Sequence, residues 1–172
     1  MTSGPMKAAV AVILLVLAVV CATAARPVIE IVAIGASNTL GWGVRGDETY
    51  PARLQSMLTA RGYNVRVANA GVLFDTTGGM LRRLDASVPD GTRIVILQPG
   101  GNDLRFFGNK EERAANIDAM VRRLRERRIR SIVFDPEISP RYFQSDGIHL
   151  TAEGHAMFAD KLLPLVIRAI AE

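Results

Sequence analysis

Ile31-Val32-Ala33-Ile34-Gly35-Ala36-Ser37-Asn38-Thr39-Leu40 is the stretch on which the interpretation of the whole chain depends. It holds the end of a dense apolar run, Val28 to Ile34, which stops at Gly35, and Ser37 follows two residues later. Such a run is typical of a buried parallel strand, and open α/β sheets place their chemistry in the loops after their strands. Taken alone, the pattern favours a serine that only caps the next helix.

Apolar runs alternate with amphipathic segments along the rest of the chain. This alternation favours right-handed strand–helix–strand crossovers, which build a parallel sheet with helices on both faces. We therefore predict an α/β fold of three layers with four strands. The expected strands are Val28 to Ile34, Val65 to Asn69, Arg93 to Gln98 and Ser131 to Phe134, and the expected helices are Tyr50 to Arg61, Thr77 to Ala86, Lys110 to Arg128 and Thr151 to Ala171.

Residues 1–25 have the composition of a secretory signal. Lys7 is their only charged residue, Ala8 to Val20 is unbroken apolar sequence, and Ala22-Thr23-Ala24 supplies the small residues of a cleavage site. We expect cleavage just after that site, which would leave residues 26–172 as a single periplasmic or secreted domain. The alternative is an uncleaved membrane anchor, because the apolar segment approaches the length that spans a bilayer.

Charge and cysteine content disfavour several functions. The chain has 21 basic and 17 acidic residues, a net charge of +4, which is too mild to indicate nucleic acid as a partner. Arginines crowd one side of the predicted helix Lys110 to Arg128, and we interpret them as a solvated face because no aromatic residues lie among them. Cys21, the single cysteine, lies in the predicted signal, so the mature domain is expected to hold no disulfide.

Four loops carry the groups that acyl transfer needs. Three of them follow predicted strands and the fourth precedes the last predicted helix, so we expect them to converge at one edge of the sheet. A serine hydroxyl needs an imidazole to take its proton and a carboxylate to fix the imidazole tautomer, while amide and backbone donors stabilise the oxyanion. The loops are Gly35-Ala36-Ser37-Asn38-Thr39-Leu40, Asn69-Ala70-Gly71 with residues 72–77 after it, Gly100-Gly101-Asn102-Asp103, and Ser145-Asp146-Gly147-Ile148-His149-Leu150-Thr151.

This ordered set of loops resembles the sequence blocks of the GDSL, or SGNH, hydrolase family. The resemblance runs from about Ile31 to His155, and within the family it is greatest to secreted bacterial arylesterases and the periplasmic thioesterase–lysophospholipase type. It implies a flavodoxin-like α/β/α sandwich, and it implies a reaction that requires no metal and no organic cofactor.

The resemblance also assigns a role to each reacting group. Ser37 would be the nucleophile, His149 its general base, and Asp146 the carboxylate that orients His149. The oxyanion hole would be lined by the backbone N–H of Ser37, the backbone N–H of Phe74 and the side chain of Asn102.

The chain departs from the family at three positions near these groups. Ala36 replaces an aspartate, which we expect to change loop packing and not the chemistry. Phe74 replaces a glycine of the oxyanion loop, so we expect a changed backbone angle or a crowded acyl pocket. Leu73 replaces a serine and makes this rim of the predicted substrate site more apolar. Trp42, the only tryptophan, is a candidate to line an acyl or aryl pocket, with packing as the alternative.

The connection between Phe134 and Tyr142 is unusually short for the family. It has only seven residues, where relatives insert a further helix and a fifth strand. We therefore expect four strands, with an exposed sheet edge or an opened site.

Together these observations predict a secreted serine ester hydrolase that works through an acyl-Ser37 intermediate. Carboxylic esters are the expected substrates, with thioesters or lysophospholipids as further candidates. The alternatives are a carbohydrate O-acetylesterase and a catalytically weak binding protein that retains the fold. A nucleotide- or flavin-binding domain is disfavoured because no Gly-x-Gly-x-x-Gly fingerprint is present. Expected partners are small-molecule or lipid esters, with membrane contact only through an uncleaved amino-terminal segment. We expect His155 to be a structural or surface residue and not a second base, and Asp103 to cap or brace its loop.

Overall fold

The computed structural model describes residues 27–172, so the predicted signal at residues 1–25 lies outside the described part of the chain. Four parallel strands form one sheet in the order β2-β1-β3-β4. Their bounds are Ile29–Gly35 for β1, Val65–Gly71 for β2, Thr92–Gln98 for β3 and Arg130–Val133 for β4. The predicted α/β class and the four strands are confirmed.

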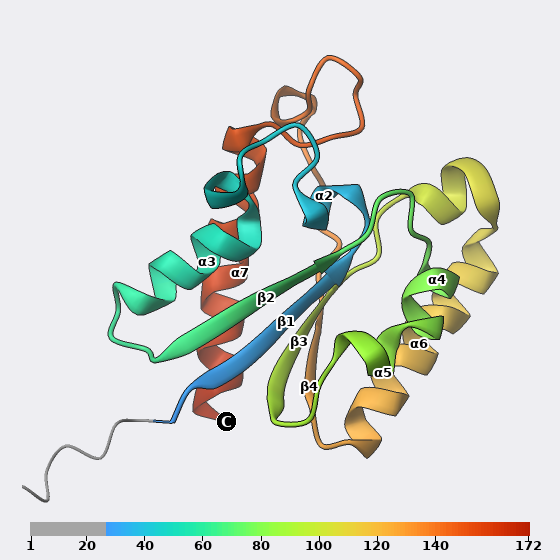
Figure 1. Ribbon diagram of the computed structural model, residues 1–172. Helices are drawn as coiled ribbons and strands as arrows, with labels where there is room; N and C mark the ends of the chain where they lie inside the picture. The colour runs from blue at the N-terminus through green and yellow to red at the C-terminus, as the bar shows by residue number, and fades with distance from the viewer. Residues whose placement is uncertain (1–26) are drawn as a thin grey trace, which may run out of the picture.

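Helices cover both faces of this sheet (Figure 1). The long ones are α3 (Tyr50–Thr59), α6 (Lys110–Glu126) and α7 (Ala152–Ala171), and the short ones are α2 (Ser37–Leu40), α4 (Thr77–Arg82) and α5 (Leu84–Ser87). Short 3-10 turns lie at Gly46–Glu48 and Pro140–Tyr142, and a π-helical turn lies at Asp103–Phe107. Within residues 27–172 no helix combines the length and apolar character needed to cross a membrane.

Strand β1 is buried on both faces, which explains its nearly continuous apolar sequence. Ile31 and Ala33 pack with α3 and α7, whereas Val32 and Ile34 pack with α4, α5 and α6. In the order β2-β1-β3, β2 lies on one side of β1 and β3 on the other. After β2 the chain therefore crosses back over β1 to form β3. The carboxyl ends of β1 and β3 therefore form the switch point at which doubly wound sheets bind ligands.

The predicted helix Thr77 to Ala86 is divided in the structure into α4 and α5. Arg83 lies between them with φ −97° and ψ 5°, outside helical geometry. Two glycines near the start of α4 weaken its helical propensity, and the Arg83 side chain is held by groups outside the helix. Tertiary contacts thus decide where this helix breaks.

The short connection after β4 contains only one 3-10 turn, at Pro140–Tyr142, before the last helix. Strand β4 has four residues and pairs only with β3, and Val133 is exposed. The predicted exposed sheet edge is confirmed.

His155, on α7, is a buried structural residue. Its Nδ1 accepts a hydrogen bond of 3.2 Å from the backbone N–H of Tyr50, and the two rings stack with centroids 6.2 Å apart. The side chain is completely buried, and its Nε2 is the one buried side-chain polar atom without a hydrogen-bond partner within residues 27–172. Burial, assisted by the charge of Arg53, lowers the pKa of His155 to about 4.

We expect this histidine to make folding sensitive to mild acid. Between its ordinary pKa of 6.5 and its folded pKa of about 4, the unfolded chain binds a proton that the native chain excludes. Stability should therefore be highest above pH 6.5 and fall on acidification by up to about 3 kcal/mol, levelling off below pH 4. Urea unfolding at intervals from pH 7.5 to 4 measures this slope; His155→Leu should flatten it between pH 6.5 and 5, and an unchanged slope would contradict the assignment.

Candidate active site

Asp146 and His149 form a compact pair in the loop before α7. One carboxylate oxygen, Oδ2, lies 2.6 Å from His149 Nδ1, and the other, Oδ1, accepts the backbone N–H groups of Ile148 at 2.9 Å and His149 at 3.0 Å. The backbone bond from His149, with those from its ring and from Ile148, lowers the pKa of Asp146 to about 2. The carboxylate is therefore ionised near neutral pH and directs the ring so that Nε2 is the nitrogen left for a reacting proton.

Asn38, the residue after Ser37, clamps the backbone on both sides of His149. Its Nδ2 donates to the carbonyl of Ile148 at 3.1 Å, and its Oδ1 accepts the N–H of Leu150 at 2.8 Å. These bonds join segments 110 residues apart in sequence. The loop after β1 and the loop before α7 therefore meet at one edge of the sheet, as expected (Figure 1).

Gln144 makes a second connection between the same two loops. Its Nε2 donates to the carbonyl oxygens of Trp42 at 2.9 Å and Leu150 at 2.8 Å. The half-exposed Trp42 ring lies 6.1 Å from the His149 ring, centroid to centroid. Sequence reasoning missed both Asn38 and Gln144 as side chains that place the histidine.

Ser37 is the first residue of α2, and Ala36 holds the position that caps this helix, without a side-chain cap bond. The Ser37 side chain is therefore not the helix cap that the simpler interpretation required. Its hydroxyl makes no hydrogen bond to another group in the described residues. The serine–imidazole contact is thus open in this structure, and such contacts commonly close only when substrate binds.

We expect Asn38→Leu to lower kcat by about 100-fold with little change in KM, because displacing a catalytic group by about 1 Å costs on that order. Asn38→Asp keeps the acceptor for Leu150 but loses the donor to Ile148, so its loss should be smaller. Steady-state kinetics on an aryl ester, with circular dichroism to verify folding, measures both. Equal kcat in all three proteins would show that the clamp does not position His149.

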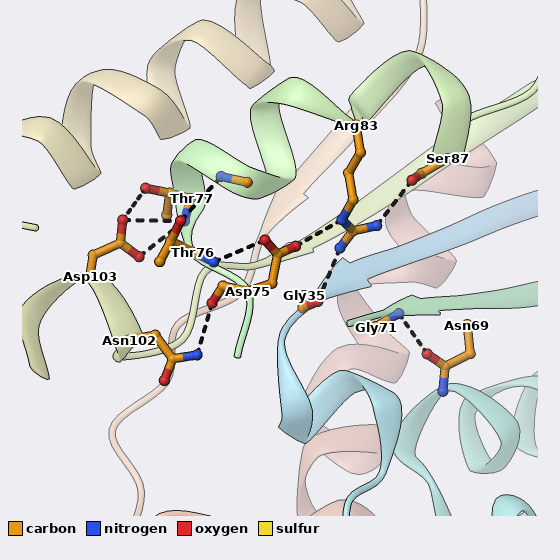
Figure 2. Close-up of polar contacts among 11 residues, drawn as sticks. Gly35, Asn69, Gly71, Asp75, Thr76, Thr77, Arg83, Ser87, Asn102 and Asp103 are labelled. Carbon is orange, nitrogen blue, oxygen red and sulfur yellow. Dashed lines mark hydrogen bonds and ion pairs between the residues drawn. The ribbon is translucent and has the colours of Figure 1, made fainter. Parts of the chain in front are cut away.

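The predicted oxyanion loop is held by a buried polar network (Figure 2). Arg83 donates from Nε to Asp75 at 2.8 Å, from Nη2 to the carbonyl of Gly35 at 3.1 Å and from Nη1 to Ser87 at 3.0 Å. Asn102 is buried, and its Nδ2 donates to the carbonyl of Asp75 at 2.8 Å. Arg83 therefore connects the end of β1 to Asp75, in the loop that carries Phe74, and Asn102 is bonded to the same Asp75.

Residues beside this network fix the start of α4. Thr76 caps α4 by accepting the N–H of Gly79 at 3.1 Å, whereas Asp75 pairs with Arg83. Asp103 braces the loop as expected, because its buried carboxylate accepts the N–H and hydroxyl of Thr77 (Figure 2).

Phe74 lies in a backbone conformation that favours glycine. Its φ is 59°, in the left-handed region, and its side chain is 66% exposed. Phe74 does not line the cavity beside Ser37, so the expected crowding of that cavity is not seen.

A cavity of about 260 Å³ opens beside Ser37 at the carboxyl ends of β1 and β3. Asn102 lines it together with Ser37, whereas Trp42 and the partly buried Leu73 do not. The roles of these two residues in substrate binding stay predictions. Within residues 27–172 no three His, Cys, Asp or Glu side chains gather as a metal site. The cavity is lined by Ala36, Ser37, Asn38, Gln98, Gly100, Gly101, Asn102, Leu104, Arg105, Arg113, Asp135, Ile138, Phe143 and Ile148.

This protein has a doubly wound sheet, a serine after the first strand and an Asp–His pair before the last helix. This arrangement is typical of α/β hydrolases that transfer acyl groups. Comparison with known proteins identifies the family within this class. The chain belongs to the GDSL-like lipase/acylhydrolase family, whose sequence profile matches residues 33–141.

Two curated relatives are similar to this chain in sequence. Esterase TesA of Pseudomonas aeruginosa is 27% identical over 127 residues, which cover 73% of this chain and 63% of TesA. An arylesterase of Vibrio mimicus is 28% identical over 128 residues, covering 71% of this chain and 62% of the arylesterase. The chain thus spans less than two thirds of the length of the curated relatives that it matches.

Solved structures have the same fold. The crystal structure of TesA has a TM-score of 0.75 with 20% identity and covers 81% of this chain and 99% of that one. The structure of AlinE4, an SGNH-hydrolase family esterase, has a TM-score of 0.63 with 26% identity and covers 84% and 97%.

Proposed function

We propose that this protein is a serine hydrolase of carboxylic esters. The observation that carries the proposal is the Asn38 clamp, which holds an Asp146–His149 pair against the residue that follows Ser37. Thioesters and lysophospholipids contain an acyl carbonyl that the same groups could attack, so they are candidate substrates as well.

The proposed reaction has two halves. In the first, His149 Nε2 removes the hydroxyl proton of Ser37 while the oxygen attacks the ester carbonyl carbon; the proton then passes to the leaving alcohol as the C–O bond breaks. In the second half, water attacks the acyl-Ser37 ester in the same way, which releases the acid and restores the hydroxyl. Asp146 stabilises the imidazolium that forms in each half.

The charge that develops on the carbonyl oxygen requires donors that are already in place. The backbone N–H groups of Ser37 and Phe74 and the Nδ2 of Asn102 are the proposed donors. The Arg83 network supports this assignment because it ties the segments that carry all three together. Preorganised donors of this kind are commonly worth about 100- to 1,000-fold in rate for each one removed.

Labelling with a fluorophosphonate tests the proposal, because only an activated serine reacts with this probe. We expect a single label, located at Ser37 by peptide mass spectrometry, together with hydrolysis of a short-chain aryl ester. Acetylated glycans tested beside longer acyl esters separate a carbohydrate O-acetylesterase from a general esterase. Absence of both labelling and turnover would favour the binding-protein alternative.

We further propose that the protein is exported, with residues 1–25 as the signal and residues 26–172 as the single mature domain. The proposal rests on the sequence of the amino-terminal segment alone. Amino-terminal sequencing of the protein from the periplasm or the medium would identify the first mature residue.

A further inference from the structure

The cavity beside Ser37 has an accessible hydrogen-bond donor in its wall, on a side chain that is otherwise buried. Gln98, at the end of β3, is only 4% exposed, and its Oε1 accepts the hydroxyl of Thr39 at 3.3 Å. Thr39 Oγ1 lies 3.0 Å from the hydroxyl of Tyr50, which donates to it, because the single proton of Thr39 is used toward Gln98. This relay leaves Gln98 Nε2 without a hydrogen-bond partner in the described residues.

Two guanidinium groups line the same cavity. Arg113 is 16% exposed; its Nε and Nη2 donate to the carbonyl of Gly100 at 3.3 and 3.0 Å, and Nη2 also pairs with Asp135 at 2.5 Å. Its Nη1 is not used in any of these bonds. Arg105 is exposed, forms no ion pair within residues 27–172, and lies 5.9 Å from the ring of Phe106.

The rest of the cavity wall is mixed. Ile138, Phe143 and Ile148 contribute apolar side chains, and Asp135, the one carboxylate in the described lining, is paired with Arg113. Apolar side chains together with donors from one amide and from Arg105, whose charge has no ion-pair partner among the described residues, match a short aliphatic chain that ends in an anion. The volume of about 260 Å³ equals that of about nine water molecules in the liquid, which suits a small acyl group.

The position of the cavity indicates which part of an ester enters it. Ser37, Asn102 and Ile148 line the cavity, but His149 and Trp42 do not. In the proposed reaction the leaving alcohol departs beside His149, because that residue gives it a proton, whereas the acyl group stays on Ser37. The cavity therefore lies on the acyl side.

We propose that the preferred substrates are half-esters of short dicarboxylic acids such as succinate, with the free carboxylate bound by Arg105, Arg113 and the Gln98 amide. This inference rests on the proposed function. The reaction remains ester hydrolysis: water adds to the acyl carbon, the alcohol leaves, and the dicarboxylic acid is released through an acyl-Ser37 intermediate.

The test compares two aryl esters with four-carbon acyl chains, the monosuccinate and the butyrate, which differ in the terminal carboxylate. We expect kcat/KM for the monosuccinate to exceed that for the butyrate by about tenfold or more at low salt. Arg105→Gln should lower this ratio by about tenfold, Arg105→Lys by less, and Gln98→Met should lower it as well. Arg122→Gln, an exposed arginine of α6, is the matched control and should leave the ratio unchanged.

A ratio of one or below in the wild type, or a ratio that Arg105→Gln leaves unchanged, would overturn the inference. If butyrate is hydrolysed in a Ser37-dependent way under either of those results, only the substrate class is wrong. If neither ester is hydrolysed in a Ser37-dependent way, the proposed function is wrong and the substrate class with it.

Discussion

Ser37→Ala is expected to lower kcat for a short-chain aryl ester by about 10⁵- to 10⁶-fold, the largest effect of any single substitution in this chain. Without the hydroxyl no acyl-enzyme can form, and the imidazole has no proton to remove. Losses of this order follow removal of the nucleophile in serine proteases, and the residual rate comes from the oxyanion hole and binding. Steady-state assays of the purified wild-type and Ser37→Ala proteins measure the difference in kcat.

Two features make this experiment decisive. Ser37 is only 7% exposed and its hydroxyl supports no hydrogen bond in the described residues, so alanine should leave the melting temperature nearly unchanged. Ser56→Ala is the matched control, because Ser56 is an exposed serine of α3 remote from the cavity. Turnover that survives in Ser37→Ala at the wild-type level would show that another group carries the reaction.

The strands and the meeting of the loops could be predicted because they depend on patterns that lie close together in sequence. The apolar run before Gly35 is long and dense enough to be a buried strand. Strands alternate with helices along the chain, and the connections between such parallel strands are almost always right-handed. These rules place Ser37 and His149 at one edge of the sheet. The Asp146–His149 contact is predictable as well, because the two residues are three apart in one loop.

The side chains that hold the site together could not be predicted from those patterns. In the sequence Asn38 is only one residue of the block around Ser37, and no pattern distinguishes Arg83 from the other arginines. Their contacts reach across 110 and 48 residues, so they depend on how the folded loops approach each other. No local pattern in the sequence indicates contacts between segments so far apart.

Phe74 shows a different limit of sequence reasoning. The sequence indicated either a changed backbone angle or a crowded pocket; in the structure φ is 59°, in the left-handed region, and the largely exposed Phe74 does not line the cavity. A non-glycine residue in this region costs on the order of 1 kcal/mol, which the Arg83 network around the loop can offset. Whether a chain tolerates that cost depends on its surroundings and cannot be judged from the residue alone.

Asp146→Asn is expected to lower kcat by up to about 10⁴-fold while the protein stays folded. Asparagine can still accept the backbone N–H groups of Ile148 and His149 through its carbonyl oxygen, so the loop should keep its shape. The side chain that faces Nδ1 loses its charge, however, and can present an N–H that favours the wrong tautomer. The imidazolium that forms during the reaction would then lack its counter-charge.

The charge of Asp146 separates an electrostatic role from a structural one. Because its hydrogen bonds lower the pKa of Asp146 to about 2, the carboxylate is ionised across the working range. The two proteins are therefore compared near neutral pH, where the wild-type side chain is charged and the amide of the variant is not. Asp118→Asn, an exposed position on α6, is the control. A variant with full kcat would mean that the 2.6 Å contact shapes the loop without taking part in catalysis.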